Sequence, residues 1–196
     1  MNGAKPTKSI IEKTASAMGL EEALDYIEAQ SKLYDLNLDA LKKKYQNLYE
    51  KYKAEKERLK IMSRFEYEGY ALGYRRIGGV DEAGRGPLAG PVVAACVVLK
   101  RDTFIPNVND SKKLTEKSRE KVYDMIMECA EDIGIGIVDH ETIDEINILN
   151  AAKMAMKKAV ENLKILPDYL LTDAVEIPDC TPVQKPIVKG DALSVS

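Results

Sequence analysis

The sequence has no long apolar run, and this absence argues against a membrane-spanning helix. Such a helix needs roughly 20 consecutive apolar residues, and no stretch of the 196 residues approaches that length. The N-terminus, MNGAKPTKSIIEKTASAMG, also lacks the apolar core of a secretory signal. We therefore expect a cytoplasmic protein without a membrane partner.

Cysteine and histidine, the side chains typical of thiol and zinc sites, are scarce. Cys96, Cys129 and Cys180 are odd in number and widely spaced, which indicates neither a disulfide framework nor a thiolate metal site. We expect free thiols, buried in the fold. The single histidine, His140, lies in the polar stretch VDHETIDEIN, which favours a loop or turn role over catalysis.

An excess of positive charge is also missing. The net charge is −3 and the isoelectric point is near 5.4, so no global basic field indicates binding to nucleic acid. Any such binding must depend on local patches or on metal ions.

Between Ser9 and Met62 proline is nearly absent, and apolar side chains recur at steps of three, four or seven. This spacing predicts helices, and Gly19 and the stretch 35–39 predict breaks that divide the segment into two or three of them. The opposite face of the last helix carries lysines: Lys42, Lys43, Lys44, Lys51, Lys53 and Lys56. Two interpretations stay open, contacts along a phosphate backbone or an ordinary solvated face.

After this helical segment the chain changes to short runs rich in valine and isoleucine, at residues 77–80, 92–99 and 133–138. These runs predict three successive antiparallel strands. Between the last two, the pattern predicts a helix capped by Thr115 and ending near Gly134. INILNAAKMAMKKAVENLKIL predicts another helix, stopped by Pro167. YLLTD is typical of a buried strand, and KPIVKGDALSVS of a strand that turns into a helix. The fold class is therefore α/β, a mixed sheet with helices on both faces.

The segment GGVDEAGRGPLAGPVV, residues 78–93, holds the most distinctive chemistry of the chain. The stretch from Gly84 to Ala89 formally matches a dinucleotide-binding fingerprint. However, two prolines and the β run that follows leave no helix to hold a pyrophosphate. The acids in front of it, Asp81 and Glu82, end a β run and are the better candidates.

Acids at the ends of strands converge on one edge of a sheet. Asp81 and Glu82 end the first run, Asp173 ends YLLTD, and Asp191 stands at the start of the last expected helix. Clustered carboxylates repel one another, and a hard divalent cation such as Mg²⁺ relieves that repulsion. The alternative is that each acid caps a turn or helix separately.

Adjacent strand residues point to opposite faces, so Asp81 and Glu82 can share metals only if the strand ends or bulges between them. Gly84 and Gly86 favour such a break. Their missing side chains would also let backbone N–H groups approach a phosphate or sugar, with Arg85 available to a second phosphate.

Five motifs together closely resemble ribonuclease HII, the bacterial type 2 ribonuclease H: GVDEAGRGPLAGPVVAACVVL, DSKKL, INILNAAKMAM, LLTD and KGDALSVS. The resemblance implies a ribonuclease H-like fold and an endonuclease that uses Mn²⁺ or Mg²⁺. The implied partners are RNA–DNA hybrids and duplex DNA containing single ribonucleotides. The implied reaction cuts the RNA strand to leave 5′-phosphomonoesters, as ribonucleotide excision repair requires.

The resemblance also implies roles for particular residues. The family's four catalytic, metal-binding acids correspond to Asp81, Glu82, Asp173 and Asp191. Its glycine–arginine–glycine segment, which contacts the ribonucleotide 2′-OH, corresponds to Gly84, Arg85 and Gly86. The phosphate-binding lysines of DSKKL correspond to Lys112 and Lys113.

The similarity covers residues 67–196, which we expect to form the catalytic domain after a helical N-terminal extension of residues 1–66. The family continues past SVS through further helices and a tyrosine that stacks beside the junction nucleotide. We therefore expect a member truncated at its C-terminus. Family members also commonly have glycine where this chain has Ala174.

Two other functions stay open. The first is a different metal-dependent nuclease or phosphoryl transferase of the same fold, which would cut without regard to the 2′-OH. The second is a non-catalytic or impaired hybrid-binding fragment, a consequence of truncation. The leading function predicts two metal ions about 4 Å apart that clamp the scissile phosphate.

Overall fold

The computed structural model describes residues 5–86 and 89–187. It divides into two units, Met1–Glu57 and Arg58–Ser196, with the division inside helix α3 (Asp39–Met62). Each unit has a buried apolar core of its own. The expected domain boundary at residues 66 and 67 stays a prediction.

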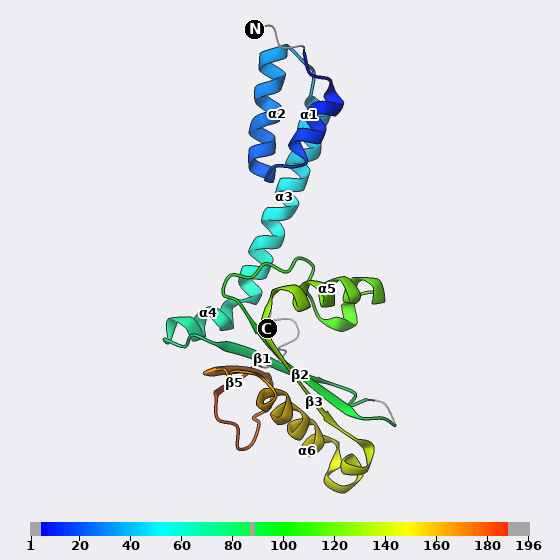
Figure 1. Cartoon of the computed structure of the whole chain (residues 1–196), viewed down its shortest axis with the longest axis vertical. Helices are drawn as coiled ribbons and strands as arrows, with labels where there is room; N and C mark the ends of the chain where they lie inside the picture. Colours follow the sequence, from blue (N-terminus) through cyan, green and yellow to red (C-terminus); the bar gives the residue numbers. More distant parts are fainter. Residues whose placement is uncertain (1–4, 87–88, 188–196) are drawn as a thin grey trace. The chain divides into compact units, whose positions relative to one another are not determined.

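The first unit contains α1 (Lys8–Ala15), α2 (Leu20–Tyr34) and most of α3 (Figure 1). Helix α2 begins after Gly19, and Asp35 ends it with a left-handed backbone at φ 47°. Both expected breaks are therefore confirmed. The helices enclose a small apolar core: Ile11, Ala15, Ala23, Ile27, Leu38 and Tyr45.

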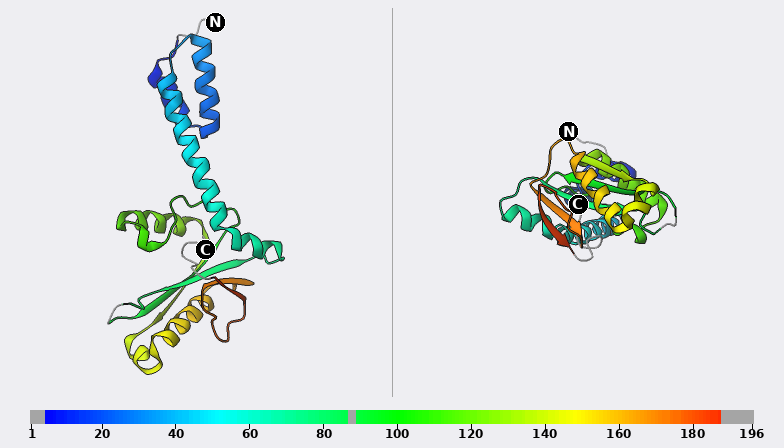
Figure 2. Two further views of the ribbon diagram at one scale, coloured as in Figure 1. Left: turned by 180° about the vertical axis from the view of Figure 1, so that it is seen from behind. Right: turned by 90° about the horizontal axis from the view of Figure 1, so that it is seen from below.

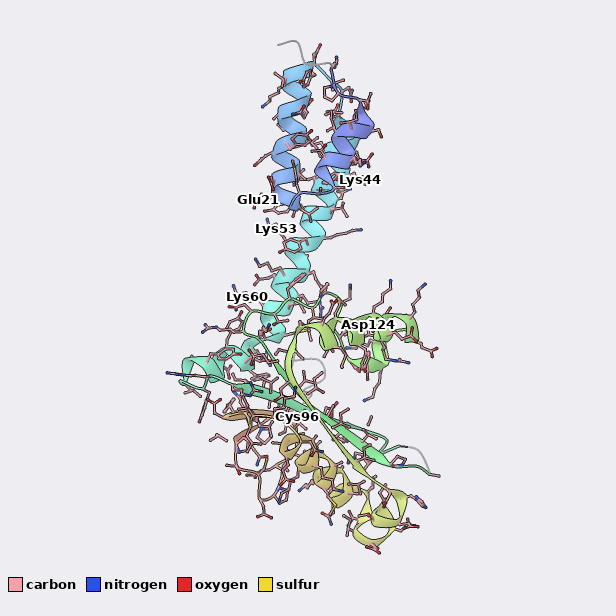
Figure 3. The ribbon with its side chains drawn as sticks, in the orientation of Figure 1. Glu21, Lys44, Lys53, Lys60, Cys96 and Asp124 are labelled. Carbon is pink, nitrogen blue, oxygen red and sulfur yellow. The ribbon has the colours of Figure 1, made fainter. Side chains whose placement is uncertain are left out.

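The lysines of α3 take part in the packing of this unit. Lys42 forms an ion pair with Glu28 of α2, and Lys44, labelled in Figure 3, pairs with Glu12 of α1 at 2.6 Å. These two side chains are partly neutralised within the unit. They therefore contribute less to an open basic surface than their spacing in the sequence indicates.

The second unit is built on a five-stranded sheet in the order β3-β2-β1-β4-β5. The strands are β1 (Ile77–Ala83), β2 (Val92–Leu99), β3 (Ala130–Val138), β4 (Tyr169–Asp173) and β5 (Val183–Ile187). The helices are α4 (Arg64–Ala71), the short 3₁₀ helix η1 (Ser111–Lys113), α5 (Glu116–Cys129) and α6 (His140–Glu161). As predicted, β1, β2 and β3 are antiparallel neighbours. Strand β4 pairs with β1 in parallel, and β5 pairs with β4 in parallel, which makes the sheet mixed.

Helix α6 covers one face of this sheet (Figures 1 and 2). Alternate residues of β2, which are Val92, Ala94, Cys96 and Val98, are buried in the core beneath it. On β3 the facing residues are Gly134 and Gly136, where an added Cβ would lie 2.0 and 1.9 Å from carbonyl oxygens of α6. The absence of side chains there lets the helix approach the strand closely.

The opposite face of β1 and β4 carries a second cluster. Ile77, Tyr169 and Leu171 are buried there, with aromatic side chains at Phe65 and Tyr70 packed against them. Residues of β1 therefore alternate between the α6 face and this face, which decides where the candidate acids lie.

Two helix boundaries and the role of His140 differ from the sequence-based predictions. Helix α5 ends at Cys129 rather than near Gly134, because β3 already begins at Ala130 and pairs with β2. Helix α6 is kinked at Asn147, and the part after the kink agrees with the predicted helix. The turns before the kink were not predicted; they begin at His140, where Asp139 caps the helix by accepting the N–H of Thr142 at 2.9 Å. His140 is therefore an exposed first-turn helix residue, not a loop residue.

The expected free thiols are confirmed. Cys96 is fully buried (Figure 3), and burial raises the pKa of its thiol to about 12. Cys129 and Cys180 are also free but only partly buried. Within residues 5–86 and 89–187, no helix is both long and apolar enough to cross a membrane.

Candidate active site

Asp81 and Asp173 come from neighbouring parallel strands. The pairing of β1 with β4 places Val80 opposite Thr172, and each aspartate is the next residue of its strand. Because paired residues of parallel strands project to the same face, the two carboxylates start from the same edge and the same side of the sheet. The adjacency expected for these two acids is present.

Glu82 lies on the other face of β1. Asp81 pairs with Ala95 and Glu82 with Ala94, and the register continues without a shift to Ala83 opposite Val93. The end or bulge that we expected between the two acids is therefore absent. The main-chain N–H of Glu82 donates to the Asp81 carboxylate at 2.8 Å, but the side chains point to opposite sides.

The Glu82 carboxylate is held by Arg85. The guanidinium Nη1 donates to Oε1 of Glu82 at 2.8 Å, across the turn that follows β1. The Glu82 side chain is 10% exposed, whereas that of Arg85 is 46% exposed. This pair was not predicted from the sequence, where the two residues have separate expected roles. The available signal was the three-residue spacing of opposite charges next to a glycine turn.

The two glycines beside Arg85 differ in their surroundings. Gly84 has φ 98°, and a Cβ on it would lie 2.6 Å from the carbonyl oxygen of Pro91. A Cβ on Gly86 would meet no heavy atom within 4 Å. The fold therefore requires glycine at position 84, while position 86 faces open space where a ligand backbone could approach.

The turn after Asp173 is tightly defined. The Thr172 hydroxyl donates to the carbonyl oxygen of Val175, and the N–H of Ala174 donates to that of Ile187 at 3.0 Å. Ala174 adopts a left-handed backbone with φ 53°, a conformation that favours glycine. This backbone explains physically why glycine suits the position, and it fixes the direction in which the chain leaves Asp173.

Two of the remaining predicted site residues belong to the 3₁₀ helix η1. Lys112 and Lys113 are exposed residues of η1, where the Asp110 carboxylate accepts the main-chain N–H of Lys112 at 3.0 Å and lies 3.9 Å from Lys113 Nζ. Asp191 lies outside the described residues.

The donor chemistry of the acids suits a hard divalent cation, because carboxylate oxygens are the ligands that Mg²⁺ and Mn²⁺ prefer. Asp81 and Asp173 provide two such groups from adjacent strand ends. Among the described residues, however, no three His, Cys, Asp or Glu side chains are grouped closely enough to hold a metal ion. Glu82 would have to leave its position on the opposite face of β1 to join the two aspartates.

Comparison with known proteins decides the family. The family model described as Ribonuclease HII matches residues 78–195. Ribonuclease HII of Acetivibrio thermocellus is 50% identical over 186 residues, which cover 95% of this chain and 73% of the relative. The chain belongs to the ribonuclease HII family. Ribonuclease HII of Bacillus pumilus is 47% identical over 204 residues, covering all of this chain and 75% of the relative. The assignment identifies a ribonuclease H enzyme, and the chain spans about three quarters of the length of these relatives.

Solved structures with a similar fold support the architecture of the second unit. The ribonuclease H2 from Pyrococcus horikoshii OT3 matches with a TM-score of 0.53 and 26% identity, over 60% of this chain and 64% of that one. Bst-RNase HIII in complex with Mn²⁺ matches with a TM-score of 0.52 and 18% identity, over 65% of this chain and 50% of that one. The expected ribonuclease H-like mixed sheet flanked by helices is thus confirmed.

Proposed function

We propose that this chain is a metal-dependent endonuclease that hydrolyses the RNA strand of RNA–DNA hybrids, including single ribonucleotides embedded in duplex DNA. The observation that carries the proposal is the placement of Asp81 and Asp173 next to each other on the parallel strands β1 and β4, inside the segment that matches the family. We further propose that it acts in the cytoplasm, as its bacterial relatives suggest.

The proposed metal site consists of four acids: Asp81, Glu82, Asp173 and Asp191. Two Mn²⁺ or Mg²⁺ ions held there would activate the attacking water and stabilise charge on the leaving 3′ oxygen. Asp81 and Asp173 serve as the fixed part of the site, because their strands are locked by pairing on both sides. Glu82 is the part that must change its position to join them, because Arg85 holds its carboxylate on the opposite face.

In this proposal, the loop after β1 binds the ribose. The open space at Gly86 lets main-chain groups approach the sugar, and a 2′-OH, which both donates and accepts hydrogen bonds, separates RNA from DNA. Arg85 carries a guanidinium that suits a phosphate oxygen pair. Lys112 and Lys113 add exposed positive charge for a neighbouring phosphate.

The test uses three duplexes of equal length: an RNA–DNA hybrid, a DNA duplex with one ribonucleotide, and an all-DNA duplex. We expect cleavage of the first two with Mn²⁺ or Mg²⁺, products ending in 5′-phosphate, and no cleavage with chelator. Equal cutting of the all-DNA duplex would overturn the specificity for the 2′-OH. Binding of the hybrid without any cutting in either metal would overturn the catalytic assignment.

A further inference from the structure

The ion pair between Glu82 and Arg85 joins two residues to which the proposed function gives different tasks. Glu82 is a proposed metal ligand, and Arg85 a proposed phosphate ligand. With Nη1 of Arg85 2.8 Å from Oε1 of Glu82, each group is engaged with the other. A carboxylate oxygen that accepts a charge-assisted hydrogen bond has less capacity left for a cation.

Burial explains why this pair forms. The Glu82 side chain is 10% exposed, and a carboxylate so far removed from water needs a compensating charge. Arg85, which is 46% exposed, supplies that charge from the solvent side. In the described part of the chain it is the cation that contacts Glu82.

The geometry of β1 determines on which face of the sheet the ion pair of Glu82 and Arg85 lies. The unbroken register through Ala83 directs Glu82 away from the face that carries Asp81 and Asp173. Arg85 keeps the carboxylate on that far side. This arrangement agrees with the lack of any three-acid group among the described residues.

We propose that Arg85 and the metal compete for Glu82. Without metal, Arg85 holds the carboxylate. When a divalent cation engages Glu82 together with Asp81 and Asp173, the guanidinium is released and becomes available to the phosphate of the substrate. This competition rests on the proposed metal site. It also sets the order of binding, because the metal must bind first to free the Arg85 guanidinium for the substrate.

The competition predicts a measurable change in metal affinity. If Arg85 occupies Glu82 about nine-tenths of the time, the apparent affinity for metal is lowered about tenfold. Arg85→Gln, which removes the charge but keeps a similar length, should therefore tighten Mn²⁺ binding by roughly tenfold in calorimetric titration. A purely structural role for Arg85 predicts the opposite sign, because loss of a structural contact loosens the site.

The matched control is Arg101→Gln. Arg101 is 62% exposed, and its loss changes the net charge by the same amount as the loss of Arg85. It follows the end of β2 that pairs with the start of β1, whereas Glu82 lies near the other end of β1. The Arg101→Gln variant should bind Mn²⁺ with the affinity of the wild type. In a Glu82→Gln background, Arg85→Gln should leave the affinity unchanged, because the partner for which it competes is gone. Equal tightening in that background would show a general charge effect and overturn the competition.

A second readout is thermal unfolding followed by circular dichroism. Without metal, Arg85→Gln should melt below the wild type, because Glu82 has lost its partner, and saturating Mn²⁺ should abolish the difference. If the variant does not fold without metal, Arg85→Lys replaces it, with smaller tightening expected. No tightening in either variant overturns the competition.

The failure of this inference can be distinguished from failure of the proposed function. Asp81→Asn should abolish Mn²⁺ binding whether or not Arg85 competes. If it does so while Arg85→Gln binds Mn²⁺ no more tightly than the wild type, the competition alone is overturned. If Asp81→Asn leaves Mn²⁺ binding intact, the metal site and the competition fall together.

Discussion

At the scale of single residues, Gly84 and Gly86 lack a side chain for different reasons. Gly84→Ala forces a Cβ to within 2.6 Å of a main-chain oxygen at φ 98°, so we expect a loss of at least about 2 kcal/mol of folding stability. Gly86→Ala enters open space, so its stability should stay within about 0.5 kcal/mol of the wild type.

The same Gly86→Ala variant should cut a duplex with one ribonucleotide about tenfold less efficiently in kcat/KM, because the added methyl group blocks approach of the sugar, an effect of about 1.4 kcal/mol. Urea unfolding and single-ribonucleotide cleavage check the two properties separately. Wild-type activity in Gly86→Ala would exclude this loop position from substrate contact.

A substitution at Ala174 should raise the folding stability rather than lower it. Its φ of 53° places an L side chain in the left-handed region, which costs about 1–2 kcal/mol relative to the ordinary helical region. Ala174→Gly relieves this strain but loosens the unfolded chain, so we expect a net gain of about 1 kcal/mol and a rise in melting temperature of about 3 °C.

The control for Ala174 is Ala95→Gly, an exposed position within β2 outside the left-handed region. That change should lower stability, because glycine in a strand interior loses entropy without relieving strain. A lower melting temperature for both variants would mean that the backbone at Ala174 carries no strain.

At the scale of elements, β3 and α6 approach each other closely at two glycines. A Cβ at Gly136 would lie 1.9 Å from the carbonyl oxygen of Ala155, which is backbone and cannot rotate away. Gly136→Ala should therefore displace the helix and cost about 3 kcal/mol in urea unfolding. A loss under about 0.5 kcal/mol would show that α6 can shift freely, contrary to this packing.

The strands were largely predictable because their signal is local. Strand β2 spans Val92–Leu99 as predicted, since its short, continuous apolar run, rich in valine, is enough to define it. The start of α6 was missed because its first turns are polar and interrupted at Asn147, whose φ is 66°. The end of α5 was misplaced because pairing of Ala130 with Leu99, a distant partner, takes the chain out of the helix.

The candidate site was predictable to a similar degree. The adjacency of Asp81 and Asp173 follows from two acids that each come directly after four buried strand residues. The position of Glu82 on the far face does not follow from local sequence, because it depends on whether the pairing with β2 continues to Val93. Its pairing with Arg85 depends in turn on that backbone path.

At the scale of the whole molecule, the acids Asp81, Glu82 and Asp173 belong to the second unit, and the lysine-bearing α3 lies mostly in the first. We propose that the first unit adds contacts to substrate phosphates and takes no part in the chemistry. Deleting residues 1–57 should raise KM about threefold and weaken its dependence on salt, with kcat little changed, because such contacts add uniform binding.

That deletion is checked by steady-state cleavage at several salt concentrations, after circular dichroism has confirmed folding. The ion pairs of Lys42 and Lys44 limit the expected effect, since both lysines are already partly neutralised. An unchanged KM at every salt concentration would contradict duplex binding and favour docking to another protein.

The central claim, that neighbouring acids of β1 and β4 hold the catalytic metal, is tested most directly with Asp81→Asn on a duplex with one ribonucleotide. Loss of a metal ligand should lower kcat at least about a hundredfold. Folding and binding of the duplex should be retained, because less negative charge near phosphate does not weaken binding. Asp124→Asn on α5, an exposed acid labelled in Figure 3, is the matched control and should cleave at the wild-type rate. Metal-dependent turnover by Asp81→Asn at the wild-type rate would contradict the account.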